Sequence, residues 1–364
     1  MMKISINVLY ILLLLLGACS DTPEVIKAPT AKRVVPSKPL LTQKTNEKQK
    51  LSDYGFFKAP LSDLIPNPRV YSYDVNTPLF SDYASKKRFV FLPEETQMEY
   101  NPTASNLLFE KGSVLIKNFY YPASDGQERI IETRLLIKEK EGWKPLNYIW
   151  NEEQSDASLN YIGADIEVEW IKNETHTQKV NYSVPNLNQC KNCHISDSDI
   201  TPIGLSIAQL NRKNPLLSVD KNQLAFFQEA KLIKNLPKKH NWSKLPVWNN
   251  PLTGSVEERA KAYLDANCAY CHSPKGSAKN SGLHLNYTEI NTRSRGIYKP
   301  PVAAGKGSGD LVYDIVPGDP EHSILLYRMK SKDPSIQMPE LGRSLVHEEG
   351  IALISEYIQN LQKK

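Results

Sequence analysis

The chain has 364 residues, a formal net charge of +5 and a hydrophobic fraction of 40%, which is typical of a globular protein long enough for two domains. So small a net charge gives no support for nucleic acid as a partner. The sequence contains five cysteines, and because all five fall in short motifs, none is left over for a disulfide.

The first cysteine ends an apolar run near the N-terminus. Lys3 supplies a positive start, residues 4–16 are mostly apolar, and Leu16-Gly17-Ala18-Cys19 resembles a bacterial lipobox. We expect residues 1–18 to be removed as a signal peptide and Cys19 to be lipidated, which tethers a protein to a membrane without spanning it. The alternatives are an ordinary signal peptide or an uncleaved anchor helix, although the run is short for a bilayer. Ser20 favours an outer-membrane address in a Gram-negative bacterium.

Residues 19–50 are rich in proline, lysine and threonine and nearly free of aromatic residues, which predicts a flexible tether. Residues 51–200 predict a mainly antiparallel, sandwich-like β domain that ends in the first of two cysteine motifs. Strand-like runs alternate there with turn signals such as Ser124-Asp125-Gly126. The candidate strands are 87–92, 113–121, 129–138, 143–150, 165–171 and 178–184.

The first motif, Cys190-Lys191-Asn192-Cys193-His194, has the CxxCH pattern of c-type haem attachment, in which two thiols bond one porphyrin and the next histidine ligates iron. A strand and the turn Val184-Pro185-Asn186 precede it, whereas a standard class I cytochrome c has a helix there. Zinc or a redox dithiol is the competing interpretation. The other axial ligand is open: His176, His240 and Met98 are candidates by residue type, and a five-coordinate iron is the alternative.

The second CxxCH motif has the surroundings of a class I cytochrome. Residues 201–254 predict a helical or irregular connector, and residues 255–364 predict an all-α class I cytochrome c domain. The S-x-x-E pattern at 255–258 is a capping box ahead of a helix over 256–267. That helix runs directly into Cys268-Ala269-Tyr270-Cys271-His272, so we expect one helix to position the whole motif.

A methionine loop and a last helix complete this prediction. Apolar residues recur at helical spacing over 351–361, which predicts an amphipathic helix that crosses the one before Cys268. Met338, followed by proline, lies where class I cytochromes carry their sulfur ligand, so we predict Met338 opposite His272. Met329 is the competitor, but it lies in a helical pattern where methionine commonly fills gaps in the core. We also expect the second ring nitrogen of His272 to donate to a backbone carbonyl in the following loop.

Several stretches outside the motifs resemble a family of bacterial di-haem c-type cytochrome lipoproteins, and the likeness runs from about residue 51 to the end. The resemblance implies a β-rich amino-terminal region joined to a class I cytochrome c domain, and it implies no specific physiological reaction. One departure from the class I pattern is that Ala260 and Leu264 stand where a glycine and an aromatic residue often pack, which predicts a looser helix crossing. The stretches are 76–83, 131–135, 150–154, 184–186, 317–320 and 345–350.

These motifs predict a lipid-anchored, periplasm-facing protein with two covalently bound c-type haems that transfers electrons between redox protein partners, a dehydrogenase and a respiratory acceptor. One alternative is a di-haem peroxidase-like oxidoreductase with an open first haem, and another is a zinc or binding module without haem. No catalytic residue is predicted. The expected thioether residues are Cys190, Cys193, Cys268 and Cys271, and the expected axial ligands are His194, His272 and Met338.

Overall fold

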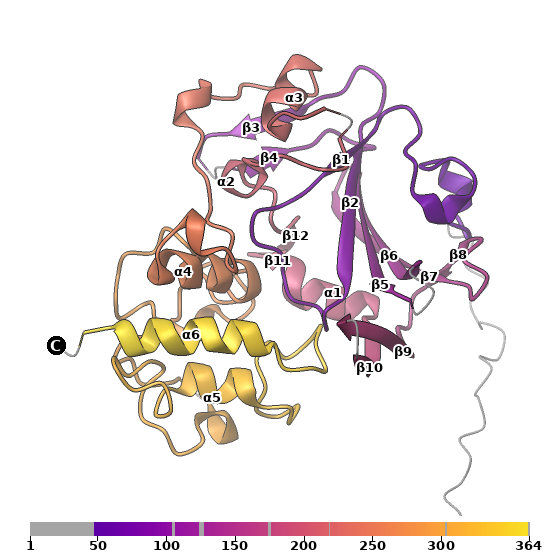
Figure 1. Ribbon diagram of the computed structural model, residues 1–364. Coiled ribbons are helices and arrows are strands. Elements are labelled where there is room, and N and C mark those ends of the chain that lie inside the picture. The colour runs from indigo at the N-terminus through magenta and orange to yellow at the C-terminus, as the bar shows by residue number, and fades with distance from the viewer. Residues whose placement is uncertain are drawn as a thin grey trace, which may run out of the picture. The chain divides into compact units, whose positions relative to one another are not determined.

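The structure is a computed structural model that describes residues 47–103, 106–123, 127–173, 176–217, 219–302 and 304–362 (Figure 1). For residues 172, 173 and 176 it describes the backbone alone. The expected signal peptide, Cys19 and most of the expected tether therefore lie outside the described residues. From Glu47 onward the chain forms one compact unit. Across the described ranges, no helix is both long enough and apolar enough to cross a bilayer.

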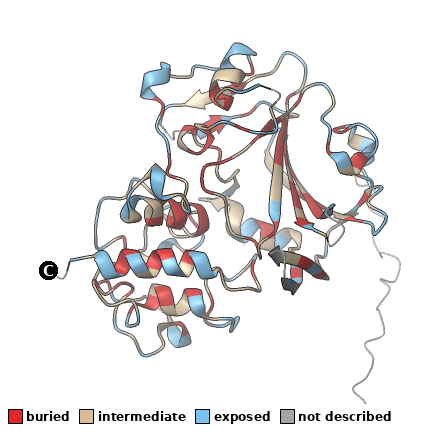
Figure 2. Cartoon of the chain, viewed as in Figure 1, coloured by how far each residue is buried: buried red, intermediate tan, exposed pale blue. Residues whose placement is uncertain are grey.

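The main sheet has six strands in the order β1-β2-β5-β6-β7-β8, and all neighbours in it are antiparallel. The middle strand β5 is buried along most of its length (Figure 2). Leu115 packs in one apolar cluster and its neighbour Ile116 in another, so both faces of the sheet are covered. The strands are β1 (Val70–Tyr73), β2 (Ser85–Phe91), β5 (Val114–Pro122), β6 (Glu128–Glu139), β7 (Gly142–Trp150) and β8 (Ala157–Asn160).

Three smaller sheets surround the main one. The hairpin of β9 (Ala164–Asn173) and β10 (His176–Val184) packs Trp170 and Tyr182 against Phe119 and Tyr121 of β5. In a second sheet, β13 pairs in parallel with β3 and β4 pairs antiparallel with β3. The bounds of the remaining strands are β3 (Met98–Asn101), β4 (Asn106–Leu108), β11 (Ile195–Ser196), β12 (Asp199–Ile200) and β13 (Ile233–Lys234).

The α-helices described are short, and five of them pack in two places. The helices α2 and α3 place Leu210, Leu224 and Phe227 against a cluster that also contains Leu115 of the main sheet. The helices α4, α5 and α6 pack together beside the β-rich part (Figure 1). The bounds are α1 (Leu187–His194), α2 (Ile207–Leu210), α3 (Gln223–Glu229), α4 (Val256–Asn267), α5 (Ile324–Lys330) and α6 (Glu348–Asn360), and 3₁₀ turns lie at 52–54, 61–63, 239–241, 251–253, 279–281 and 305–308.

The expectation of a sandwich-like β domain followed by a separate all-α class I cytochrome c domain is wrong. Among the described residues 28% are in strands and 23% are helical, and the six α-helices are scattered. The described residues between α4 and α5 contain no α-helix. The C-terminal part is also bonded to the β part, because the backbone N–H groups of Ser344 and Leu345 donate to the Asp82 carboxylate at 2.8 and 2.7 Å. The loop before α6 is therefore fixed by a residue of the β part.

The helices α4 and α6 cross at a glycine that the sequence reading did not single out. Gly350 lies in the first turn of α6 and faces Tyr263 of α4, whose hydroxyl bonds His347 Nδ1 at 2.9 Å. A Cβ atom on Gly350 would overlap the Tyr263 ring and come within 2.8 Å of His347 Nδ1. We expected a loose helix crossing, but the two helices are close at this point. Here α6 supplies the glycine and α4 supplies the aromatic ring.

We predict that Gly350→Ala lowers the free energy of unfolding by about 1–3 kcal/mol, the usual cost of overpacking a filled interior. Urea unfolding of the purified protein measures it. Because the Tyr263 hydroxyl is the atom that a Cβ would meet first, the same substitution should cost less in a Tyr263→Phe background. The exposed position Glu356→Ala on the same helix is the control. An equal loss in both backgrounds would show that the contact with Tyr263 is not the cause.

Candidate functional site

The first CxxCH motif lies on a helix, which the sequence did not predict. Helix α1 begins after Asn186, whose side chain accepts the N–H groups of Asn188 and Gln189, while Gln189 bonds back to the Asn186 N–H at 2.9 Å. This capping box starts the helix that carries the motif, whereas a class I cytochrome c has a helix before its CxxCH motif. Asn147 of β7 donates to the Pro185 carbonyl at 2.5 Å and to Cys190 Sγ at 3.8 Å, so the main sheet fixes the start of α1.

A two-stranded hairpin orients His194. Strands β11 and β12 pair directly after the motif and bring Thr201 back onto the histidine. The Thr201 carbonyl lies 2.8 Å from His194 Nδ1, and the Thr201 N–H donates to the His194 carbonyl at 2.7 Å. A carbonyl oxygen can only accept a hydrogen bond, so Nδ1 carries the proton. The lone pair of Nε2 is then available to bind a metal.

The second motif follows α4 as predicted. The predicted helix over 256–267 and its capping box between Ser255 and Glu258 are confirmed. Beyond the helix, the Cys268 carbonyl accepts the N–H groups of Cys271 and His272 at 3.1 and 2.9 Å. These bonds wind the motif into a turn that continues α4.

The loop after the second motif folds tightly over Cys271 and holds His272. A Cβ on Gly276 would overlap the Cys271 carbonyl, so glycine is required there. His272 Nδ1 lies 3.1 Å from Ser281 Oγ, and the Ser281 hydroxyl donates to the Ala278 carbonyl at 2.7 Å. The hydroxyl oxygen therefore accepts from His272. We expected His272 to donate to a backbone carbonyl, but the acceptor is the Ser281 side chain. The hydrogen bond still holds the ring through Nδ1 and leaves Nε2 available to a metal.

The two motifs line two adjoining cavities. A cavity of about 200 Å³ is lined by Cys190, Cys193 and His194, and one of about 570 Å³ by Cys268, Cys271 and His272. The Cys271 thiol also lies 3.7 Å from the carbonyl of Asn192 in the first motif. The two motifs are therefore neighbours in space. Residues lining both cavities are Cys193, Asn267, Cys268, Tyr270, Met329, Met338, Pro339 and Leu341.

Burial keeps both motif histidines neutral. It lowers the pKa of His194 to about 4, with Lys117 and Arg134 adding to the effect. It lowers the pKa of His272 to about 4 as well, with Arg328 and Lys299 adding to the effect. Neutral imidazole is the form that binds a metal, so both side chains are prepared for coordination at neutral pH.

Met338 lines the same cavity as His272, on a loop held by one buried arginine. Arg343 donates to the Met338 carbonyl at 2.9 Å and to the Ser331 carbonyl at 2.9 Å, and the Met338 N–H donates to the Arg328 carbonyl at 3.0 Å. Met329 also lines both cavities, but it lies on α5 and packs in the core shared by α4, α5 and α6. The sequence reading did not identify the role of Arg343.

Two of the candidates for the second axial ligand at His194, Met98 and His240, are not brought to its cavity. Met98 is buried in the cluster beneath α2 and α3, and His240 is exposed on a 3₁₀ turn. The His176 side chain lies outside the described residues. Among the described residues of this cavity, the other imidazole and thioether side chains are His347, Met329 and Met338.

His347 has a structural environment. Its ring stacks on Phe80 with 4.1 Å between the ring centres, Nδ1 bonds the Tyr263 hydroxyl, and Nε2 lies 3.7 Å from Glu349. Burial lowers the pKa of His347 to about 4. A histidine in an unfolded chain has a pKa of about 6.5. The contribution of neutral His347 to stability is therefore complete above pH 6.5 and is lost as the pH falls through 4.

We predict that acid destabilises the wild-type protein more than it destabilises His347→Gln. Between pH 7 and 4 the free energy of unfolding should fall by up to about 3 kcal/mol more in the wild type, the value of a shift from 6.5 to 4. Urea unfolding at a series of pH values measures the two slopes. His322→Gln, which changes an exposed histidine, is the control. Identical slopes for wild type and His347→Gln would contradict the prediction.

The four motif cysteines do not converge on one point. Within the described ranges, no group of three or more histidine, cysteine, aspartate or glutamate side chains could hold a metal ion. No family model, curated protein or solved structure matches the chain.

Proposed function

We propose that the protein is a di-haem c-type cytochrome that carries electrons on the periplasmic side of a bacterial membrane. The observation that carries this proposal is that both CxxCH motifs line cavities, each with its histidine held through Nδ1 and its Nε2 left free. A c-type haem supplies one-electron redox chemistry when bound. Its partners are a dehydrogenase and a respiratory acceptor, and its anchor is a lipid on Cys19.

The residues of the second cavity fit a haem. Cys268 and Cys271 would hold the porphyrin edge, and His272 and Met338 would ligate its iron. The volume of about 570 Å³ is within the usual range of cofactor sites. Three cations, Arg295, Lys299 and Arg328, line this cavity together with apolar residues and two carboxylates, Asp314 and Glu340. A complete axial pair at this site favours electron transfer over catalysis.

The first cavity favours a second candidate, a peroxidase-like oxidoreductase. Cys190, Cys193 and His194 would hold the haem there, and none of the expected distal ligands is placed opposite His194 by the described side chains. Both ring nitrogens of His347 face other partners. An iron at this site would then keep a position for a small ligand, which a pure electron carrier does not need.

Spectroscopy of the purified full-length protein, matured in a host that installs c-type haem, tests both candidates. We expect two covalent haems per chain from the mass of the denatured protein and from the reduced absorption spectrum. Carbon monoxide added to the reduced protein should leave both haems unchanged if the protein is an electron carrier, and should change one of them if the first haem is open. A mass equal to that of the polypeptide plus lipid would end the cytochrome proposal.

A further inference from the structure

Three basic side chains form a row on three neighbouring strands of the main sheet. In the antiparallel register, Arg88 of β2 pairs with Lys117 of β5, and Lys117 pairs with Arg134 of β6. Directly paired residues point to the same face, and all three side chains line the cavity of the first CxxCH motif. Like charges in this position repel, so the row destabilises the sheet unless something compensates it.

The two outer cations have carboxylate partners and the central one has none. Arg88 pairs with Asp74 at 2.9 Å, and Arg134 pairs with Glu132 at 2.8 Å. For Lys117, the described residues provide neither a carboxylate within ion-pair distance nor a hydrogen-bond acceptor. Its Nζ lies 4.9 Å from the centre of the Phe119 ring, and the Arg134 guanidinium carbon lies 4.4 Å from the same ring. The Lys117 amine therefore lies in an enclosed space without a carboxylate partner among the described residues.

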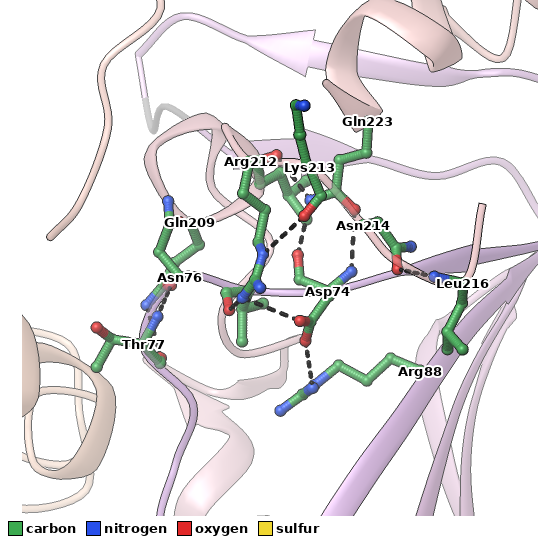
Figure 3. A network of polar contacts seen from close by, with 12 residues as sticks. Asp74, Asn76, Thr77, Arg88, Gln209, Arg212, Lys213, Asn214, Leu216 and Gln223 are labelled. Carbon is green, nitrogen blue, oxygen red and sulfur yellow. Dashed lines mark hydrogen bonds and ion pairs between the residues drawn. The ribbon is translucent and has the colours of Figure 1, made fainter. Parts of the chain in front are cut away.

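The nearby carboxylates are committed elsewhere. Asp74 is held between Arg88 and Arg212, both at 2.9 Å, in the network of Figure 3. Glu132 has no exposed area, binds Arg134 through both oxygens and accepts from Tyr182 at 2.9 Å. Asp82 accepts the backbone N–H groups of the loop at 344–345. None of them is free to neutralise Lys117.

We propose that Arg88, Lys117 and Arg134 form a cationic wall that binds a carboxylate or another oxyanion in the first cavity, with Lys117 as its central donor. The anion is either a propionate of the first haem or a small free oxyanion that enters the same cavity. Only the propionate source rests on the proposed function. Burial, with the neighbouring cations, lowers the pKa of the Lys117 amine well below its usual value, and a bound anion would reverse that effect.

The test compares Lys117→Gln with wild-type holoprotein. Lys117→Arg retains the charge, and Lys179→Gln makes the same change of net charge at an exposed lysine. Haem content is measured first, then both midpoint potentials, then nitrite binding by calorimetry. For a propionate, one midpoint potential should fall in Lys117→Gln alone, because an unpaired carboxylate favours ferric iron. For a free oxyanion, nitrite should bind about tenfold more weakly to Lys117→Gln, the loss expected for one charged hydrogen bond.

Two results would overturn the proposal while two haems remain bound. One is that Lys117→Gln matches the wild type in both potentials and in nitrite binding. The other is a change of one haem from low spin to high spin in Lys117→Gln without added anion, which would identify the Lys117 amine as an iron ligand. A wild-type protein without haem would instead refute the proposed function, and nitrite binding to that protein would then decide whether the wall holds an anion.

Discussion

Replacing Cys190 and Cys193 with alanine is expected to halve the haem content, from two haems per chain to one. Replacing Cys268 and Cys271 should do the same for the other haem, because each CxxCH motif supplies both thioether bonds of one porphyrin. Both variants should remain folded. The main sheet and the core shared by α4, α5 and α6 each contain many buried apolar residues besides these cysteines. Mass spectrometry of the denatured variants and the reduced absorption spectrum measure the number of covalent haems.

The fifth cysteine provides the matched control for the haem count. Cys19→Ser should keep both haems and lose the membrane association of the protein, because the lipobox reading gives Cys19 the lipid and no part in either motif. Loss of both haems in either pair variant would indicate that the two cavities mature as one site. Stoichiometric zinc in place of haem would contradict the prediction and restore the zinc module as the interpretation.

The strands could be predicted from sequence because alternation and turn residues act locally. Each of the six candidate strands overlaps an observed strand, for example 129–138 with β6 (Glu128–Glu139). Within the connector over 201–254, which was expected to be helical or irregular, the described α-helices are the short α2 and α3. The prediction of a separate all-α domain failed for a long-range reason. The loop at 344–345 is completed by Asp82, which lies more than 250 positions earlier in the chain.

The residues of the candidate site could be named from the sequence, but their arrangement could not. CxxCH spacing identifies the thiols and the histidine because, in each motif, they lie within five residues. The orientation of His194, in contrast, depends on Thr201, which the hairpin of β11 and β12 brings back onto the histidine. The row of Arg88, Lys117 and Arg134 depends on strand register, which sequence spacing alone does not fix. The contact between the two motifs, at Cys271 and Asn192, joins segments 79 positions apart.

Met338→Ala should change the second haem while leaving the protein folded. Met338 lies on a loop, its side chain is half-buried, and it faces the cavity of His272. Loss of the thioether should convert this haem from low spin to high spin and let it bind carbon monoxide. Because methionine ligation raises haem potential, its midpoint potential should fall by roughly 0.1 V or more, a modest part of the range of about 0.8 V that axial ligands span.

Met329→Ala separates ligation from packing. Met329 is 8% exposed and belongs to the core of α4, α5 and α6, so its loss should lower the free energy of unfolding by about 2–5 kcal/mol, the usual cost of truncating a buried methionine. The spin state and potential of the second haem should stay those of the wild type. The reverse pattern, a high-spin haem in Met329→Ala and an unchanged spectrum in Met338→Ala, would transfer the axial role to α5. In that case the carbonyls gathered by Arg343 would position a loop whose methionine only closes the cavity.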